Sequence, residues 1–361
     1  MDGAALLERH NPVLVIFPQE FEGRRRPGSW RPGPRGWGDY HPCSVEFFLA
    51  RVEQRDHPRA WSFRPRSLLN SILPSAWTPA SRTGYDRLRA LTARAMPAAT
   101  ASWELDVADL PSQDESVAWR EYRRLLTEAE HAYEPVAYGR FVETPSGGAL
   151  QYWYLYLYND FRNNHEGDWE MVTIEFDAQG SPVRAGYSSH RSGLQRPWAE
   201  VPRAEPGGAR PLLYVSRGSH AGSFGYHPHG HPVIGFSPSA NPPFRLRALW
   251  SKVMRVPGIR RWKDFPPADP EGDVARVPEH LGTRVSPRLL VFPGAEPSPD
   301  GEWWWMRLRC RWGSTHTRFS GTVGPGSPWV GGLLDPRWRD PLGWLGHVKS
   351  DARGQAAVRG A

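Results

Sequence analysis

Residues 150–176 constrain the fold of this chain more than any other stretch of its sequence. They form two apolar runs, 150–158 and 169–176, which a short polar loop joins. Strand side chains alternate between the two faces of a sheet. In the first run, every second residue from 152 to 158 is therefore a tyrosine on one face, while Trp153, Leu155 and Leu157 occupy the other. A strand that is apolar on both faces is typical of the centre of a β-sandwich.

The other runs predict a chain built mostly of β-strands. Short strand-like segments lie between loops rich in Gly, Pro and Ser, at residues 12–17, 136–142, 150–158, 169–176, 183–188, 212–216, 289–292 and 303–310. Helical spacing is limited to 44–54, 85–95 and 115–133, and we expect 190–210 and 225–280 to be irregular. Many short strands with few helices favour a mostly β fold, an antiparallel β-sandwich with a few peripheral helices.

We expect one domain over residues 1–350, with a helical insertion at about 57–133 and a flexible tail at 351–361. The sequence assigns no role to residues 57–113. Cys43 and Cys310 stand far apart without metal-binding spacing, so we expect reduced core residues. No apolar run is long enough to cross a membrane, and the N-terminal residues lack a signal-peptide pattern. These features predict a cytoplasmic chain without a transmembrane segment.

The net charge of +7 leaves two interpretations open. All but three of the 45 basic residues are arginines, and Pro and Gly are also abundant, which is typical of a GC-rich coding bias. An anionic partner is the functional alternative. The densest basic run, at residues 24–26, lies in a Gly- and Pro-rich loop without interleaved aromatic residues. We therefore expect no nucleic-acid partner, while peripheral membrane contact stays open.

Carboxylates and one histidine gather at the start of the second apolar run. Asp168 and Glu170 share a strand face with the large apolar residues at 172, 174 and 176, and a carboxylate buried on such a face needs a partner. One interpretation is an ion pair with an arginine. The other is a divalent cation held by Asp160, His165, Asp168 and Glu170. Carboxylate oxygens favour Mg²⁺ or Ca²⁺, and the imidazole keeps Mn²⁺, Fe²⁺ and Zn²⁺ open.

Further candidates lie outside this cluster. His220 follows the strand-like run 212–216 and is a candidate ligand or acid–base group, with a hydrogen bond to a loop carbonyl as the alternative. Glu166 is a second candidate base. Three alternating histidines have the composition of a metal-binding tract, and a polar surface loop is the alternative for them. These three are His227, His229 and His231.

The stretch HEGDWE at 165–170 resembles the H-x-x-D-W-E core of the necrosis- and ethylene-inducing-like cytolysins. In that family the His, the Asp and the Glu belong to a divalent-cation site. The preceding stretch YLYND, which ends at Asp160, is similar to the family's Y-x-P-K-D element, whose Asp is a further ligand. The resemblance implies a cation site made of Asp160, His165, Asp168 and Glu170.

A second resemblance extends over most of the chain. The HEGDWE stretch, together with NPVL at 11–14, DYHP at 39–42, YVSRGSHA at 214–221, RWG at 311–313 and GP at 324–325, is similar to the vacuolar protein sorting-associated protein 62 related family. Members of that family have no settled biochemical activity. The resemblance implies a β-sandwich similar to the cytolysin fold, with the acidic motif on one sheet and His220 near the cation.

Together these features predict a divalent-cation-dependent binding protein of that type. The cation would orient a small polar or anionic ligand, such as a lipid headgroup or a sugar, in an aromatic cleft beside His220. The aromatic residues expected there are Tyr156, Tyr158 and Trp169. The alternative is a metalloenzyme of bacterial secondary metabolism, with His220 or Glu166 as general base. Enzymatic activity and a structural role without any metal both stay open at this point.

Overall fold

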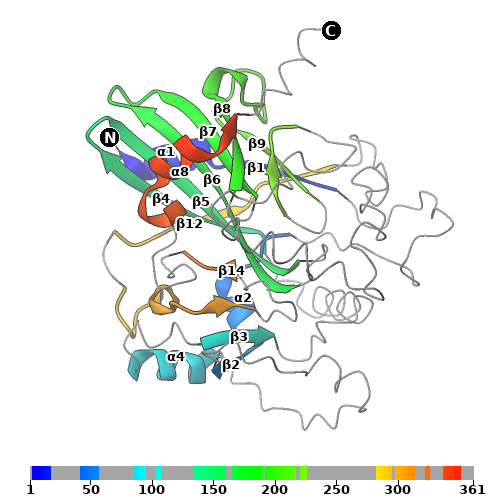
Figure 1. Cartoon of the computed structure of the whole chain (residues 1–361), viewed down its shortest axis with the longest axis vertical. Coiled ribbons are helices and arrows are strands. Elements are labelled where there is room, and N and C mark those ends of the chain that lie inside the picture. Colours follow the sequence, from blue (N-terminus) through cyan, green and yellow to red (C-terminus); the bar gives the residue numbers. More distant parts are fainter. Residues whose placement is uncertain are drawn as a thin grey trace, which may run out of the picture.

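The computed structural model describes residues 2–17, 41–56, 85–94, 103–107, 134–159, 165–189, 192–216, 220–225, 282–294, 297–313, 322–325 and 336–350. Strands in three sheets dominate these residues, and the helices among them are few and short (Figure 1). The mostly β class expected from the sequence is therefore confirmed. The helix expected at 115–133, the histidine tract at 227–231, the basic run at 24–26 and the tail at 351–361 lie outside the described residues.

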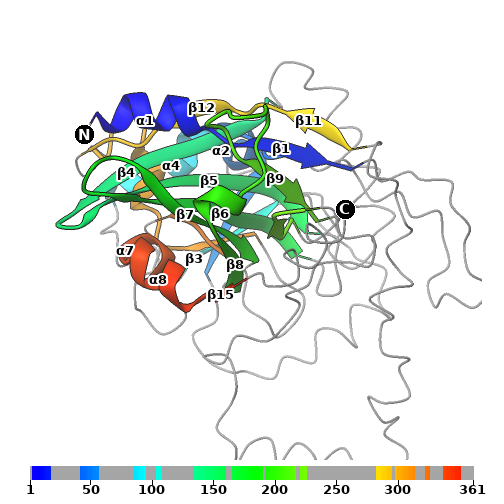
Figure 2. The ribbon, with the colours of Figure 1, turned by 90° about the horizontal axis from the view of Figure 1, so that it is seen from above.

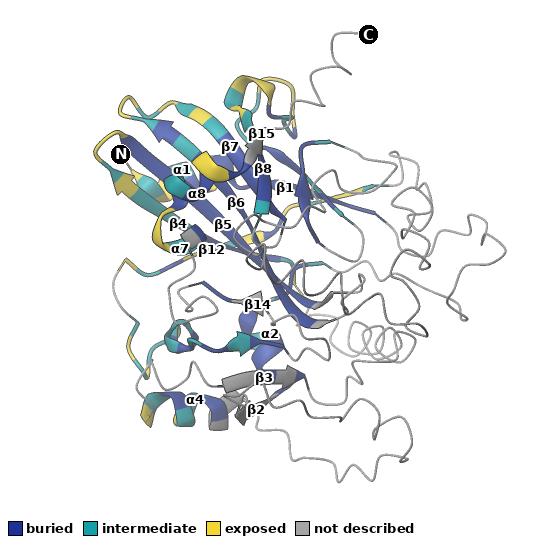
Figure 3. Ribbon diagram, viewed as in Figure 1, coloured by how far each residue is buried: buried dark blue, intermediate teal, exposed yellow. Residues whose placement is uncertain are grey.

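The largest sheet has the strand order β12-β4-β5-β6-β7-β8-β15. Its middle is an antiparallel meander of β4 (Val136–Thr144), β5 (Gly147–Asn159), β6 (His165–Asp177), β7 (Pro182–Ser189) and β8 (Ser192–Pro197). The edge strands β12 (Arg288–Val291) and β15 (Lys349–Ser350) pair in parallel with β4 and β8. The two apolar runs of the sequence are β5 and β6, and most of their described side chains are buried (Figure 3).

The pairing of β5 with β6 fixes which side chains share a face. Tyr156 lies opposite Asp168 and Tyr154 lies opposite Glu170, so these four side chains occupy one face. Trp169 lies opposite Leu155 and points to the other face. The alternation expected from the sequence is confirmed, and it places two carboxylates beside tyrosines in the middle of the largest sheet.

A four-stranded sheet covers the carboxylate face. Its order is β10-β9-β1-β11, with bounds Gly222–Ser223, Leu212–Val215, Val13–Ile16 and Thr283–Val285. Helix α1 (Gly3–His10), which the sequence pattern did not predict, lies on the same side (Figure 2). The Tyr152 hydroxyl donates to Leu7 O at 2.9 Å, and the Tyr187 hydroxyl donates to Leu212 O at 3.0 Å. These bonds fasten α1 and β9 to the largest sheet.

Tryptophans fill the opposite face. Its cover includes the sheet β14-β13-β3-β2 (Thr322–Val323, Arg311–Trp312, Trp103–Val107 and Val52–Asp56) and helices α2 (Val45–Leu49), α7 (Pro336–Arg339) and α8 (Pro341–His347). Helix α4 (Tyr85–Arg94) packs against α2. The ring of Trp169 meets Trp312 edge-on with centroids 5.4 Å apart and stacks on Trp305 at 6.3 Å. Large aromatic side chains buried in this way dominate the energetics of a core.

The expectation of an antiparallel sandwich needs correction. Each of the three sheets contains at least one parallel pair. The pairs are β1 with β9, β12 with β4, β15 with β8, and β13 with β3. In every one of these pairs the partners come from distant parts of the chain. Parallel neighbours cannot be joined by a tight hairpin, so no local turn pattern in the sequence predicts these pairs.

Three local expectations also need correction. The helix expected at 44–54 ends at Leu49, and residues 52–56 form β2 because they pair with β3. The strand expected at 303–310 is instead the 3₁₀ helix η5 (Trp304–Arg307). The region 190–210, expected to be irregular, contains β8 and the short helix η2 (Trp198–Glu200).

The expectations for one helix and for the two cysteines are confirmed. Helix α4 matches the segment expected at 85–95. Cys43 and Cys310 are both buried and form no disulfide. Among the residues that the structure describes, no helix has the length and apolar character needed to span a membrane.

Candidate functional site

Asp168 and Glu170 lie two residues apart on β6, and both side chains are buried. Each stands beside a fully buried tyrosine of β5, Tyr156 next to Asp168 and Tyr154 next to Glu170. Four groups that ionise or form hydrogen bonds are therefore enclosed on the side of the sheet that β9 and β10 cover. Enclosing such groups is unfavourable unless each finds a partner.

His220 supplies a partner for Asp168. Its Nδ1 lies 3.1 Å from Asp168 Oδ2, and only 2% of the imidazole side chain is exposed. An ionised carboxylate only accepts hydrogen bonds, so we assign the hydrogen to Nδ1, which donates to Asp168. In the neutral ring this leaves the lone pair on Nε2. Asp168 thereby fixes the tautomer of His220, as carboxylates do for many metal-binding and catalytic histidines.

The backbone at His220 is strained. Its φ angle is +56°, and among the described residues no other non-glycine residue has a positive φ. A residue held in this region costs of the order of 1–3 kcal/mol. Two hydrogen bonds close the bend, from His220 N to Ser216 O and from Ser216 N to Ala221 O, each at 3.0 Å. Backbone strain of this kind clusters at functional sites.

The imidazole of His220 stacks on Tyr156. The ring centroids are 4.1 Å apart and the planes differ by 7°. Burial, followed by the negative charges of Glu170 and Asp168, raises the pKa of Tyr156 well above its ordinary value of 10. The phenol is therefore neutral at physiological pH and keeps its hydrogen for donation.

Glu170 is held by Ser188 of β7. The Ser188 hydroxyl donates to Glu170 Oε2 and accepts a hydrogen bond from Met171 N at 2.7 Å. The Ser188 side chain is fully buried. Sequence reasoning gave this residue no role, although a serine in an apolar strand next to the carboxylate strand was a usable signal.

Two hydroxyls of the cluster differ from those of the other buried tyrosines. Among the described residues, no group is in hydrogen-bonding position to the hydroxyl of Tyr154 or Tyr156. Tyr152, by contrast, donates to a carbonyl of α1. Buried polar groups in folded proteins almost always bond to a protein atom, a water or an ion. The two hydroxyls beside the two carboxylates therefore mark where a further polar group fits chemically.

Glu166, the other candidate base, serves a different part of the fold. Its Oε2 accepts a hydrogen bond from Val107 N of β3 at 2.7 Å, whereas Asp168 contacts His220 next to β9. Between the two carboxylates, Gly167 adopts a left-handed conformation with φ +61°. The two candidate bases thus have different partners: the side chain of Glu166 contacts β3, whereas that of His220 contacts Asp168 on β6.

The structure places the remaining predicted residues as follows. Trp169 lies in the tryptophan core, on the face opposite Asp168. The side chains of Tyr158 and His165, and the whole of Asp160, lie outside the described residues. Within the described part of the chain, no group of three or more His, Cys, Asp and Glu side chains could hold a metal ion. Because the side chain of His165 and the whole of Asp160 are not described, the only predicted cation ligands with described side chains are Asp168 and Glu170.

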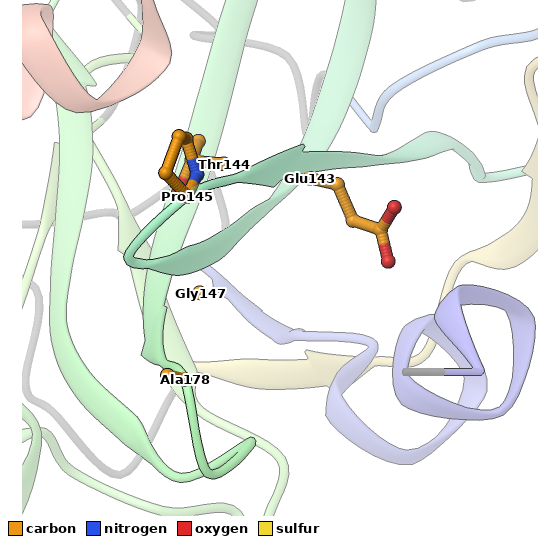
Figure 4. Close-up of a pocket in the computed structure, with 5 residues that line it drawn as sticks. All are labelled: Glu143, Thr144, Pro145, Gly147 and Ala178. Carbon is orange, nitrogen blue, oxygen red and sulfur yellow. The ribbon is translucent and has the colours of Figure 1, made fainter.

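A hollow of about 480 Å³ lies elsewhere, at the turns that join β4 to β5 and β6 to β7 (Figure 4). Figure 4 shows the Glu143 side chain projecting away from Pro145 and Ala178. The described residues that line it do not direct a set of polar groups at one point. Its lining consists of Glu143, Thr144, Pro145, Gly147 and Ala178. The hollow contains none of the predicted site residues, and we assign it no function.

No protein-family model matches the chain. No curated protein matches it either. Among solved structures, NLPPya in complex with glucosamine is similar over 25% of this chain and 45% of its own, with 16% identity and a TM-score of 0.21. NLPPya in complex with mannosamine gives 19% identity, coverage of 25% and 43%, and a TM-score of 0.20. The non-toxic HaNLP3 protein gives 17% identity, coverage of 26% and 46%, and a TM-score of 0.22.

These neighbours are necrosis- and ethylene-inducing proteins, the group whose motif the HEGDWE stretch resembles. The chain spans less than half the length of each of them, and the TM-scores are too low to establish a common fold. The comparisons give no support to the resemblance to the vacuolar protein sorting-associated protein 62 related family.

Proposed function

We propose that this chain is a divalent-cation-dependent binding protein, and that Asp168 and Glu170 are cation ligands in the buried cluster on β6. Asp160 and His165 complete the ligand set in this proposal, which joins two carboxylates of known position to two residues assigned from the sequence. A cation between Asp168 and Glu170 would also relieve the repulsion between two buried carboxylates on one strand face. Oxygen ligands favour Mg²⁺ or Ca²⁺, and His165 keeps Mn²⁺, Fe²⁺ and Zn²⁺ open.

The observation that carries the proposal is the pair of tyrosine hydroxyls in this cluster. Tyr154 and Tyr156 are fully buried, and no described residue forms a hydrogen bond with either hydroxyl. Burial is the first cause that raises the pKa of both phenols, so each keeps a hydrogen to donate. The waters of a bound cation, or the oxygens of a polar ligand on that cation, would accept these hydrogens.

The same chemistry indicates the class of ligand. Two neutral phenols donate, and a cation attracts lone pairs, so the site suits a small ligand with several oxygen atoms. Hydroxyls of a sugar and the phosphate of a lipid headgroup both meet this requirement. A ligand without oxygen acceptors would leave the hydroxyls of Tyr154 and Tyr156 unsatisfied.

Calorimetric titration with CaCl₂ and with MgCl₂, combined with elemental analysis, tests the proposal. The wild type is expected to bind one cation, and Asp168→Asn is expected to bind it at least tenfold more weakly. Glu175→Gln is the matched control, because Glu175 lies on the same strand but is half-buried and pairs with Arg184. A wild-type protein without binding heat or stoichiometric metal in metal-replete buffer would contradict the proposal, as would an equal loss in the control.

One contact favours a second candidate, a metalloenzyme that uses His220 as general base. Hydrogen bonding of Nδ1 to Asp168 is the arrangement that orients a catalytic imidazole and leaves Nε2 to take a proton. Turnover of p-nitrophenyl acetate or p-nitrophenyl phosphate by the metal-loaded protein, lost in His220→Gln but kept in His10→Gln, would support it. His10 is a suitable control because it too is buried, with its Nδ1 near a carbonyl oxygen.

A further inference from the structure

The beginning of β6 meets the end of β13 at a very short distance. Gly167 has φ +61° and Gly313 has φ +92°, both in the left-handed region. A Cβ atom at Gly313 would lie 1.8 Å from Glu166 O, and one at Gly167 would lie 2.3 Å from Trp312 O. Both obstacles are backbone atoms, so no other residue type fits at either position unless the two chain segments move apart.

A third glycine packs tightly beside the contact between Gly167 and Gly313. Gly324 follows β14, and a Cβ atom there would lie 2.5 Å from Trp312 Nε1 and 3.0 Å from Trp169 Nε1. The rings of Trp169 and Trp312 are perpendicular, with centroids 5.4 Å apart. The segment around Gly313 is therefore held tightly against β6, immediately next to the residues of the candidate site.

At the close contact between Gly167 and Gly313, neighbouring carboxylates of β6 contact different sheets. In a regular strand Glu166, Asp168 and Glu170 would stand in one row on one face, with like charges side by side. Instead, Glu166 accepts a hydrogen bond from Val107 N of β3 at 2.7 Å, and Asp168 contacts His220 at 3.1 Å. Gly167, which is left-handed, lies between them, while the pairing of β6 with β5 keeps the same register on either side of it.

We infer that Gly313 is a positioning residue for the candidate site. Its contact with the peptide between Glu166 and Gly167 holds Glu166 against β3 and leaves Asp168 facing His220. The site then receives two carboxylates from β6 and not three, which lowers the charge that a bound cation must balance. This consequence rests on the proposed function, whereas the geometry of Asp168 and His220 exists without any cation.

The contact between His220 and Asp168 is observable by NMR in the cation-free protein. Long-range ¹H–¹⁵N spectra of ¹⁵N-histidine-labelled protein report the tautomer of each imidazole, and the His220 signal is identified by its absence from His220→Gln. The wild type is expected to show His220 with hydrogen on Nδ1. Gly313→Ala is expected to abolish that pattern and to weaken Ca²⁺ binding at least tenfold.

Gly207→Ala is the matched control. Gly207 is also left-handed, with φ +71°, but nothing lies within 4 Å of a Cβ atom placed there. Gly207→Ala therefore introduces the same kind of backbone strain without a steric clash. The His220 signal in this variant is expected to stay as in the wild type. A loss of the signal in Gly207→Ala equal to that in Gly313→Ala would overturn the inference.

A milder pair of variants carries the test if Gly313→Ala does not fold. Glu166→Ala removes the acceptor of Val107 N and is expected to alter the His220 signal, whereas Glu166→Gln keeps a carbonyl oxygen and is expected to preserve it. An unchanged His220 signal in Glu166→Ala, or in a folded Gly313→Ala, overturns the inference. If the wild type binds no cation but the signal changes as expected, the proposed function fails and the positioning role stands.

Discussion

The imidazole of His220 and the phenol ring of Tyr156 lie face to face, with centroids 4.1 Å apart, although they come from segments more than sixty residues apart in the chain. Asp168 binds the same imidazole, so a polar cluster joins β5 and β6 to the bend after β9. A buried polar cluster is unfavourable when its hydrogen bonds are only partly satisfied. The effect of each of its groups on stability can therefore be measured in variants.

The unfolding free energy of Tyr156→Phe is expected to stay within about 1 kcal/mol of the wild type, because the variant keeps the ring and removes a hydroxyl to which no described residue bonds. Its Ca²⁺ affinity is expected to fall. Tyr152→Phe is the control: it leaves Leu7 O without its donor and is expected to lose about 1–1.5 kcal/mol. Urea unfolding at pH 7 measures both, and an equal loss in the two variants would contradict the hydrogen-bond assignment.

His10 makes the stability of the fold depend on pH. Its side chain is buried with Nδ1 2.9 Å from Ala209 O. Burial lowers the pKa of His10 below its ordinary value of 6.5, and the positive charges of Arg9 and Arg203 lower it further, against the opposing effect of the hydrogen bond to Ala209. The unfolded chain therefore binds a proton more readily than the folded chain. The contribution of neutral His10 to the unfolding free energy is fully present above pH 6.5. It is lost as the pH falls from 6.5 through the pKa that His10 has in the folded chain.

The unfolding free energy of the wild type is therefore expected to decrease between about pH 7.5 and about pH 5. His10→Gln, which cannot gain a charge, is expected to show a smaller decrease over the same range. His347→Gln serves as the control because His347 is exposed on α8. Urea titrations at several pH values test this, and the same pH dependence in wild type and His10→Gln would show that His10 is not responsible.

The alternation of residues in 150–176 was enough to predict β5, β6 and the face that Asp168 and Glu170 share. Local periodicity carries that information because strand side chains repeat every two residues. It does not carry the contact between Asp168 and His220, which requires β9 to lie over the face of β6. The sequence placed His220 near the site only through a family resemblance that the comparisons do not support.

Other features were beyond local patterns for a different reason. The close approach of Gly167 to Gly313 depends on β13, and β13 is positioned by parallel pairing with β3. Trp169 stands next to Asp168 in the sequence, yet it belongs to the tryptophan core because the two alternate across the sheet. Adjacency in a motif therefore suggested a shared cleft where strand geometry separates the two side chains.

Both cysteine thiols are expected to be inert in the folded protein. Cys43 and Cys310 are fully buried, and burial raises the pKa of each thiol well above its ordinary value of 9. The reactive thiolate is therefore scarce at neutral pH, and a reagent cannot reach it. Ellman's reagent is expected to detect no thiol in the native chain and both thiols in guanidinium chloride. Rapid reaction of one thiol without denaturant would contradict the burial of that residue.

The burial of the tryptophans at 303–305 distinguishes a 3₁₀ helix from the strand that the sequence suggested for this segment. In a strand, neighbouring side chains point to opposite faces, so only one of Trp304 and Trp305 would be expected to pack in the core. In η5 both are buried, with exposures of 0% and 1%. Trp304→Ala and Trp305→Ala are therefore each expected to lower the unfolding free energy by about 3–5 kcal/mol, the usual loss for a buried tryptophan.

Trp303 is the internal control for these two variants. Its side chain is half-buried, so Trp303→Ala is expected to lose clearly less stability than either neighbour. Circular dichroism at increasing urea concentration measures all three variants against the wild type. A large loss in only one of Trp304→Ala and Trp305→Ala, with the other close to Trp303→Ala, would indicate that the segment alternates as a strand.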